Sequence, residues 1–309
     1  MEKTERTCPT LLTAASWASW CITEGCDGKQ RALTVRHLIG TLCAMLILAL
    51  HFSARADTVT LPKQVYGFGW VQAAVFSPDV SKILVVGYGA KLFDATTGDI
   101  VVCLQLEDLE VTDAAYSPDG TQVATVSGNT GDHTAKLWAV TSGALIRSLE
   151  GHEAPVTSVA FSPDGAQVLT GSADDTARLW DASTCQEIRS FAGYPVTALA
   201  FTPDGAKIAT AAGVSFFDDD EVILWDAATG QEERTLSGGN GTLASLAFSP
   251  DGSLLIAGST DKTVKLWDLS QSRLRRPVRG FVGAERIDAV AFSPDGTQVL
   301  AGSRDWTAK

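Results

Sequence analysis

The sequence predicts an all-β fold built from repeated four-stranded units, and the evidence is a recurring turn phrase and its spacing. From residue 57 onward, the phrase Phe-Ser-Pro-Asp-Gly or a close variant recurs, with its prolines at positions 78, 118, 163, 203, 250 and 294. The spacings of 40, 45, 40, 47 and 44 residues suit a unit of four short strands. Because this part of the chain lacks apolar residues at helical spacing, we expect no helix in it.

The third unit shows how the four strands follow one another. A β-rich run, Val156–Phe161, leads into Ser-Pro-Asp-Gly, where proline fixes φ, aspartate bonds back to the chain and glycine accepts a positive φ. A second apolar run covers Gln167–Ser172, and a third, Thr176–Asp181, follows a turn at Asp174 and Asp175. The residues EIRSFAG form the fourth run. This order predicts four antiparallel strands in each unit.

The third run of each unit ends on Leu-Trp-Asp or a variant of it, and these residues carry a family resemblance. The matches are LFD at 92–94, LWA at 137–139, LWD at 179–181, LWD at 224–226 and LWD at 266–268, with one Gly-His pair at 151–152. Residues 57–309 therefore resemble the WD-repeat (β-transducin-like) β-propellers. The resemblance implies four-stranded blades in a ring, with five complete repeats and a truncated sixth here, and a full ring of seven blades.

The resemblance also implies a polar network inside each blade. In this family, a His before the first strand, a Ser or Thr on the second, an Asp in the next turn and the Trp of the third strand bond to one another. The matching residues are His152, Ser172, Asp174 and Trp180 in the third unit, Ser259, Asp261 and Trp267 in the fifth, Asp219 and Trp225 in the fourth, and Asp132 and Trp138 in the second. Since a buried indole and a buried imidazole both need hydrogen-bond partners, we expect a structural role.

Some units lack residues of this polar network. The fifth unit has Gly239 at the histidine position, and the first has Phe93 in place of the Trp. The basic residues that precede the Leu-Trp pairs are interpreted as ordinary strand surface: Lys136, Arg178 and Lys265.

A catalytic interpretation of His, Ser and Asp in one unit competes with this structural one. A catalytic triad is defined by geometry, and here each residue type already stands where the family needs it for folding. His133 is the only other histidine after residue 56, and it occupies a variable turn position. We therefore predict no catalytic residues, no metal site and no cofactor.

Residues 1–56 differ from the repeats and indicate export. Basic residues precede the apolar run Leu38–Leu50, and Ala54-Arg55-Ala56 follows it with the small-x-small form of a cleavage site. This run is short for a bilayer-spanning helix, which needs about 20 residues, so 35–56 is predicted to be a signal peptide cleaved after Ala56. An uncleaved signal that anchors the chain in the membrane is the alternative. Residues 1–34 then form an extension, consistent with a translation start at Val35.

The charge and cysteine content of residues 57–309 exclude some classes of protein. This part has 18 Lys and Arg against 32 Asp and Glu, a formal charge of −14, so a wide surface for nucleic acid or anionic lipid is not expected. It holds only Cys103 and Cys185, too few for a disulfide framework. The fold must rely on its core.

Partner-binding residues are expected in loops, because loops on a rigid scaffold carry specificity. The longest one in the fourth unit, Gly213–Val222, combines Phe216 and Phe217 with a run of four acids at 218–221. The acids are interpreted as a solvated turn, with a Ca²⁺ site as an open alternative. Exposed aromatic residues are frequent at interfaces, and the candidates are Phe216, Phe217, Trp306, Trp70 and Tyr194.

These observations predict a non-enzymatic, exported scaffold, periplasmic or secreted, that presents a loop-lined face to a protein or peptide. The alternative is an exported enzyme or small-ligand receptor with a site at the central channel. The final residues, Ser303–Lys309, align with the start of the third strand in other units, so the chain is predicted to be a fragment that stops before a further Leu-Trp-Asp.

Overall fold

The computed structural model describes residues 71–104, 110–128, 131–212, 220–239, 241–270, 273–278, 285–305 and 307–309, which all belong to one compact unit, Gly40–Lys309. They form 22 strands and no helix, so the predicted all-β fold is confirmed. None of them forms a helix long and apolar enough to cross a membrane. Several predictions fall outside these residues: the extension and signal peptide with Ala56, Trp70, Phe216, Phe217, Asp219 and Trp306.

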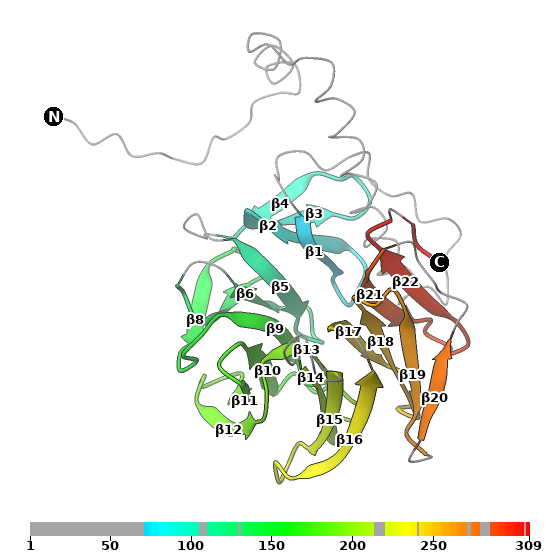
Figure 1. Ribbon diagram of the computed structural model, residues 1–309. Coiled ribbons are helices and arrows are strands. Elements are labelled where there is room, and N and C mark those ends of the chain that lie inside the picture. The colour runs from blue at the N-terminus through cyan, green and yellow to red at the C-terminus, as the bar shows by residue number, and fades with distance from the viewer. Residues whose placement is uncertain are drawn as a thin grey trace, which may run out of the picture. The chain divides into compact units, whose positions relative to one another are not determined.

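The strands form five antiparallel sheets of four strands and one of two, which we call blades 1 to 6 in chain order (Figure 1). Blade 1 has β1 (Val71–Phe76), β2 (Lys82–Gly87), β3 (Gly89–Asp94) and β4 (Ile100–Cys103); blade 2 has β5 (Val111–Tyr116), β6 (Gln122–Ser127), β7 (Ala135–Ala139) and β8 (Leu145–Leu149); blade 3 has β9 (Val156–Phe161), β10 (Gln167–Ser172), β11 (Thr176–Asp181) and β12 (Glu187–Ala192). Blade 4 has β13 (Val196–Phe201), β14 (Lys207–Ala212), β15 (Asp220–Asp226) and β16 (Glu232–Gly239); blade 5 has β17 (Leu243–Phe248), β18 (Leu254–Ser259), β19 (Val264–Asp268) and β20 (Arg273–Val278); blade 6 has β21 (Ile287–Phe292) and β22 (Val299–Ser303).

The blades follow one another so that the first strand of each lies beside the first strand of the next, from β1 through β5, β9, β13 and β17 to β21 (Figure 1). The second strand of each blade from 1 to 5 (β2, β6, β10, β14 and β18) is buried along nearly its whole length. Fourth strands such as β8 and β12 are largely exposed. The predicted four-stranded blades are confirmed, whereas the seven-bladed ring stays a prediction.

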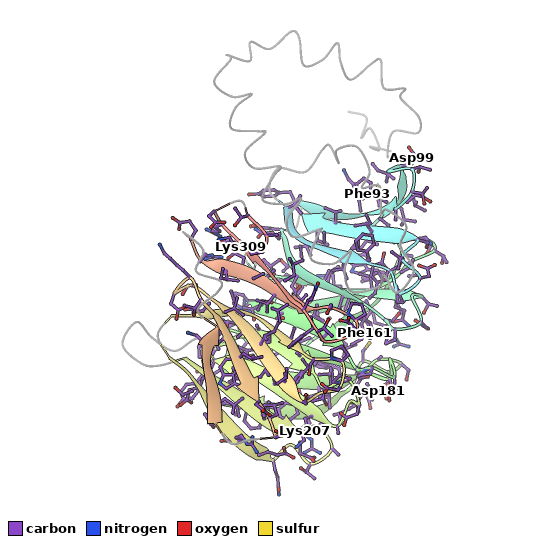
Figure 2. All side chains as sticks on the ribbon, turned by 90° about the vertical axis from the view of Figure 1, so that its right-hand side faces the viewer. Phe93, Asp99, Phe161, Asp181, Lys207 and Lys309 are labelled. Carbon is purple, nitrogen blue, oxygen red and sulfur yellow. The ribbon has the colours of Figure 1, made fainter. Side chains whose placement is uncertain are left out.

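The strand order places all connections at two ends of the blades. Because neighbouring strands are antiparallel, the first-to-second and third-to-fourth turns share one end, which we call the turn face. The second-to-third turns and the connections between blades share the other end, which we call the loop face. Figure 2 shows three residues of the turn face, Asp99, Phe161 and Asp181, along one side of the molecule.

Each Ser-Pro-Asp-Gly turn is built in the same way. In blade 3, the hydroxyl of Ser162 donates to Asp164 Oδ1 at 2.6 Å, and Gly165 has a φ of +72°. A Cβ on Gly165 would lie 3.3 Å from Cδ of Pro118 in the preceding blade, so the turn also fits one blade against the next. Blade 1 has Val80 at the glycine position with a φ of +60°, a conformation that a β-branched residue rarely adopts.

Polar side chains on the first strands join neighbouring blades. Thr157 Oγ1 donates to Val196 O at 2.6 Å, which links blades 3 and 4. Asp113 of blade 2 accepts hydrogen bonds from Ser158 Oγ at 2.9 Å and Val159 N at 3.0 Å in blade 3. The blades are therefore held in sequence by hydrogen bonds as well as by apolar packing.

Candidate functional site: the anchored turns of the loop face

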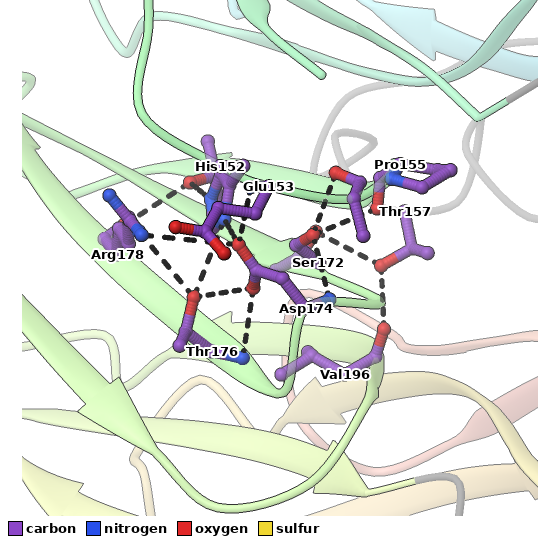
Figure 3. Close-up of polar contacts among 12 residues, drawn as sticks. His152, Glu153, Pro155, Thr157, Ser172, Asp174, Thr176, Arg178 and Val196 are labelled. Carbon is purple, nitrogen blue, oxygen red and sulfur yellow. Dashed lines mark hydrogen bonds and ion pairs between the residues drawn. The ribbon is translucent and has the colours of Figure 1, made fainter. Parts of the chain in front are cut away.

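Blade 3 carries a chain of hydrogen bonds that ends at the loop face. Trp180 Nε1 on β11 donates to Thr170 Oγ1 on β10 at 2.8 Å, and the same oxygen lies 2.7 Å from His152 Nε2. His152 belongs to the connection between β8 and β9, and its Nδ1 lies 2.8 Å from Asp174 Oδ2 in the turn after β10 (Figure 3). All four side chains are largely buried, so the chain fixes the turn to the blade interior.

The hydrogen-bond partners of His152 and Asp174 determine how these two side chains are protonated. Burial lowers the pKa of His152 below 6.5, although the Asp174 carboxylate acts in the opposite direction. Burial would raise the pKa of Asp174, but hydrogen bonds from Thr176, Glu153 N and His152 outweigh it and bring this pKa to about 2. An ionised carboxylate only accepts, so His152 donates through Nδ1–H, and its Nε2 accepts the Thr170 hydroxyl. The imidazole is therefore neutral and uses both of its nitrogens.

The sequence comparison assigned the hydroxyl of this chain to Ser172, and the structure shows that this assignment is wrong. Ser172 Oγ donates to the carbonyls of Ala154 and Pro155, both at 3.0 Å, and accepts from Asp174 N at 3.1 Å. Trp180 pairs with Val168 across the two strands. From this position its indole N–H reaches Thr170, two residues along β10, and does not reach Ser172 at the end of the strand. Ser172 thus shapes the turn through backbone groups only.

The same register explains the other blades. Trp138 donates to Thr125 at 2.8 Å, and Trp225 donates to Thr210 at 2.9 Å. Blade 5 has Ala257 at this position, and Trp267 Nε1 donates instead to the carbonyl of Ser237 at 3.3 Å. Ser259, predicted as the hydroxyl partner in blade 5, donates to Gly241 O at 3.3 Å and accepts from Asp261 N, so this prediction is wrong for the same reason. The recurring threonine two residues before the end of the second strand was the signal that would have found the partner.

Two basic residues interpreted from the sequence as strand surface contact the turn aspartates of blades 5 and 2. Lys265 is buried, with its side chain only 4% exposed, and its Nζ lies 2.5 Å from Asp261 Oδ2. Lys136 Nζ contacts Asp132 Oδ2 in blade 2 in the same manner. The interpretation as surface residues is therefore wrong for these two lysines. Long side chains bury their apolar stems readily, and only the three-dimensional register shows where the ammonium lies.

Among the predicted partner-binding residues, the structure describes Tyr194. It stands in the connection between β12 and β13 on the loop face, and its side chain is 44% exposed. Tyr88, in the turn between β2 and β3 on the same face, is 61% exposed and was not predicted. It follows directly after the buried strand β2, and an aromatic residue at the tip of so tight a turn was the available signal.

An open groove of about 570 Å³ lies on the opposite side, at the turn face between blades 4 and 5. Its charged groups are occupied within the chain: Lys207 contacts Glu233, and Arg234 Nη1 donates to Leu269 O at 3.1 Å. Asp251 accepts hydrogen bonds from Ser249 and Ser253, within its own turn. The groove therefore presents no converging polar groups comparable with those of the loop face.

The side chains of the blade 3 network do not form a nucleophilic site. Ser172 donates to backbone carbonyls and has no base within hydrogen-bond reach. Thr170, His152 and Asp174 do follow one another as a hydroxyl, a base and a carboxylate would, but the Thr170 side chain is completely buried and also accepts the Trp180 indole N–H, so no substrate can reach its oxygen. Within the described part of the chain, no three His, Cys, Asp or Glu side chains cluster as metal ligands would. The network holds a turn in place, as the resemblance implies.

Comparison with known families bears on the same repeats. A family model described as "WD domain, G-beta repeat" matches residues 101–139, 143–181, 185–226, 230–268 and 275–309. The chain belongs to the WD40 family. Each WD40 match begins at or near the fourth strand of one blade and, in the first four, ends on the third strand of the next, so the repeat and the blade are offset by one strand. Proteins with WD40 repeats serve in general as scaffolds for protein–protein interaction. Comparison with curated proteins finds no match.

Proposed function

We propose that this WD40 protein is an exported, non-enzymatic scaffold whose loop face binds a protein or peptide partner. The observation that supports it most is the anchoring of the loop-face turns in blades 2, 3 and 5. The turn aspartates bond inward, while the residues beside them, Asp175 and Lys262, have φ values of +66° and +73° and are exposed at the turn tips. Turns that are already ordered lose little conformational freedom when a partner binds.

The proposal that the protein is not an enzyme rests on the use of its polar groups. His152 and Asp174 could act as an acid–base pair at the loop face, but both hold blade 3 together through their hydrogen bonds. Proteins with WD40 repeats are typically non-enzymatic scaffolds, which supports the same proposal. Export rests on the order of basic residues, apolar run and small-x-small site at residues 35–56.

The binding proposal is tested by comparing the two ends of one blade. Tyr194 on the loop face and Ile188 at the turn-face end of β12 are 44% and 43% exposed, so their alanine variants remove similar accessible side chains. Each variant is used to capture partners from envelope extract, with quantification of bound proteins by mass spectrometry. We expect the Tyr194→Ala variant to lose a partner that the Ile188→Ala variant retains. Loss in the Ile188→Ala variant alone would overturn the choice of face.

The predicted loop residues are tested in the same capture. A Phe216→Ala/Phe217→Ala variant is expected to lose the same partner, and an unchanged set of partners would remove these residues from the proposed surface. Export is measured separately by N-terminal sequencing of the protein from the cell envelope. We expect a mature chain that begins at Asp57, and an intact precursor in the cytosolic fraction would contradict export.

A further inference from the structure

In blades 2, 3 and 5, a side-chain nitrogen contacts Oδ2 of the turn aspartate, but the type of residue that supplies the nitrogen differs between blades. In blade 3 it is Nδ1 of His152, at 2.8 Å from Asp174 Oδ2. In blade 5 it is Nζ of Lys265, at 2.5 Å from Asp261 Oδ2. We infer that lysines of the third strand replace the missing histidine as the anchor of the loop-face turn in blades 2 and 5.

Blade 5 gives the clearest geometry. Lys265 lies four residues after Asp261, on β19, and its ammonium also lies 3.3 Å from Thr263 Oγ1. Thr263 in turn donates from its hydroxyl to Asp261 Oδ1 at 2.6 Å, so ammonium, hydroxyl and carboxylate form one cluster. The position that matches His152 is Gly239, which has no side chain to reach the carboxylate.

Blade 2 repeats the arrangement with different residues. Lys136, again four residues after the turn aspartate, contacts Asp132 Oδ2 and lies 3.2 Å from Thr134 Oγ1. Thr134 donates to Asp132 Oδ1 at 2.6 Å, as Thr263 does in blade 5. The sequence from Gln105 to Glu110, which joins blades 1 and 2, contains no histidine.

Blade 3 shows what happens to the third-strand cation when the histidine is present. Arg178 occupies the position of Lys136 and Lys265, as the strand registers show. Its Nη1 bonds Glu187 on β12 at 2.9 Å, and its closest approach to Asp174 Oδ2 is 4.0 Å (Figure 3). The His152 imidazole contacts Asp174 Oδ2 in place of a cation, and the Arg178 guanidinium bonds Glu187 instead.

The electrostatics agree with an anchoring contact. Burial would raise the pKa of Asp261, but hydrogen bonds from Lys265 and Thr263 outweigh it, and the pKa is lowered. The pKa of Asp132 is lowered by the same balance, with Lys136 and Thr134 as the donors. The side chain of Lys265 is only 4% exposed, so loss of its carboxylate partner would leave a charge in a poorly solvated place; the pair in blade 2 is partly exposed and should cost less to break. The lysines therefore hold their turns firmly.

The consequence for binding rests on the proposed function of the loop face: these lysines would be positioning residues for a partner they do not touch. The anchoring itself is tested without any partner. Hydrogen–deuterium exchange of the turn peptide at 259–263 is measured for the wild type and for Lys265→Met, which keeps an unbranched stem. We expect exchange to be faster by about tenfold or more in the variant. Lys207→Met, which removes an exposed lysine from its contact with Glu233, is the matched control and should leave this peptide unchanged.

A rescue in blade 3 gives the second arm and guards against a variant that fails to fold. His152→Ala should speed exchange at 172–176, and His152→Ala with Arg178→Lys should recover part of the protection, because lysine at this strand position reaches the aspartate in blades 2 and 5. Arg178→Lys alone should change little. Unchanged exchange at 259–263 in Lys265→Met, or no recovery in the double variant, would overturn the inference while leaving the capture experiment on Tyr194 unaffected.

Discussion

Blades 3 and 5 build the same loop-face turn with different chemistry. In both, a threonine donates to Oδ1 of the turn aspartate at 2.6 Å, Thr176 to Asp174 and Thr263 to Asp261. In both, the residue after the aspartate has a positive φ. The turn therefore follows from the local phrase Ser-x-Asp-x-Thr, whatever holds the second carboxylate oxygen.

The two blades differ in what lies behind the turn. Blade 3 joins the indole, the hydroxyl of Thr170 and the neutral imidazole into one hydrogen-bonded chain. Blade 5 has a partly buried ion pair at the turn and Ala257 at the position of Thr170, and the Trp267 N–H bonds a backbone carbonyl at 3.3 Å. A local turn can thus be kept while its anchor changes from a neutral to a charged one, and the two anchors should respond differently to substitution and to pH.

The largest difference is expected when the turn aspartate is neutralised. Asp261→Asn removes the negative charge beside the buried Lys265 ammonium, and the free energy of unfolding should fall by about 3 kcal/mol. Asp174→Asn keeps an oxygen that accepts from the neutral His152 and leaves no buried ammonium without a partner, but its NH2 faces the donors of Thr176, so the loss should be smaller, about 2 kcal/mol. Urea denaturation of both variants, followed by tryptophan fluorescence, measures the two values. Equal losses would mean that the ion pair of blade 5 stabilises the fold no more than the imidazole contact of blade 3 does.

The next largest effect concerns the hydroxyl between the strands. Thr170 serves two nitrogens, those of Trp180 and His152, whereas Thr125 in blade 2 serves only the Trp138 indole among the bonds described. Each buried group that loses its partner costs about 1 kcal/mol or more. We expect Thr170→Ala to lower the free energy of unfolding by about 2 kcal/mol and Thr125→Ala by about 1 kcal/mol. The two sites are both almost fully buried, so a larger loss for Thr125→Ala would contradict the role of Thr170 as a shared partner.

The repeats could be predicted from the sequence because their signals are local. Ser-Pro-Asp-Gly sets a turn through the preferences of four adjacent residues, and Leu-Trp-Asp places an indole on a strand of known direction. These patterns fixed the number and order of the described blades. The aromatic residues of the fourth-unit loop lie outside the described residues, so Phe216 and Phe217 stay predictions.

The residues that sequence reasoning missed depend on contacts between strands and blades. Thr170 and Ser172 lie on the same face of β10, and only the pairing of Val168 with Trp180 decides which hydroxyl the indole reaches. Lys265 looks like a strand-surface residue until the neighbouring turn is placed beside it. Asp113 gave no signal at all, because its donors come from the next blade, 45 and 46 residues away.

The smallest expected effect is a difference in pH dependence between the two anchors. The pKa of His152 is lowered by burial, so its stabilising contribution is full above about pH 6.5 and declines as the pH falls below that value. The lowered pKa of Asp261 means that the contribution of blade 5 persists down to the acid range of a carboxylate, below 3.8. Blade 3 should therefore lose stability between pH 7 and 5.5, by about 1 kcal/mol at most, and blade 5 should not.

Asp113 must be removed before this loss can be seen, because it acts in the opposite direction. Burial raises its pKa to about 6, so its contribution is full below 3.8 and is lost as the pH rises through 6. Serine occupies the equivalent position in blades 3 and 5, at Ser158 and Ser245, so we expect Asp113→Ser to fold although it loses two hydrogen bonds to blade 3. In this background, stability measured by urea denaturation should decline from pH 7 to 5.5, and adding His152→Asn should flatten that decline. A slope that survives the second substitution would show that His152 is not its source, and the contrast between a pH-sensitive blade 3 and a pH-insensitive blade 5 would fail.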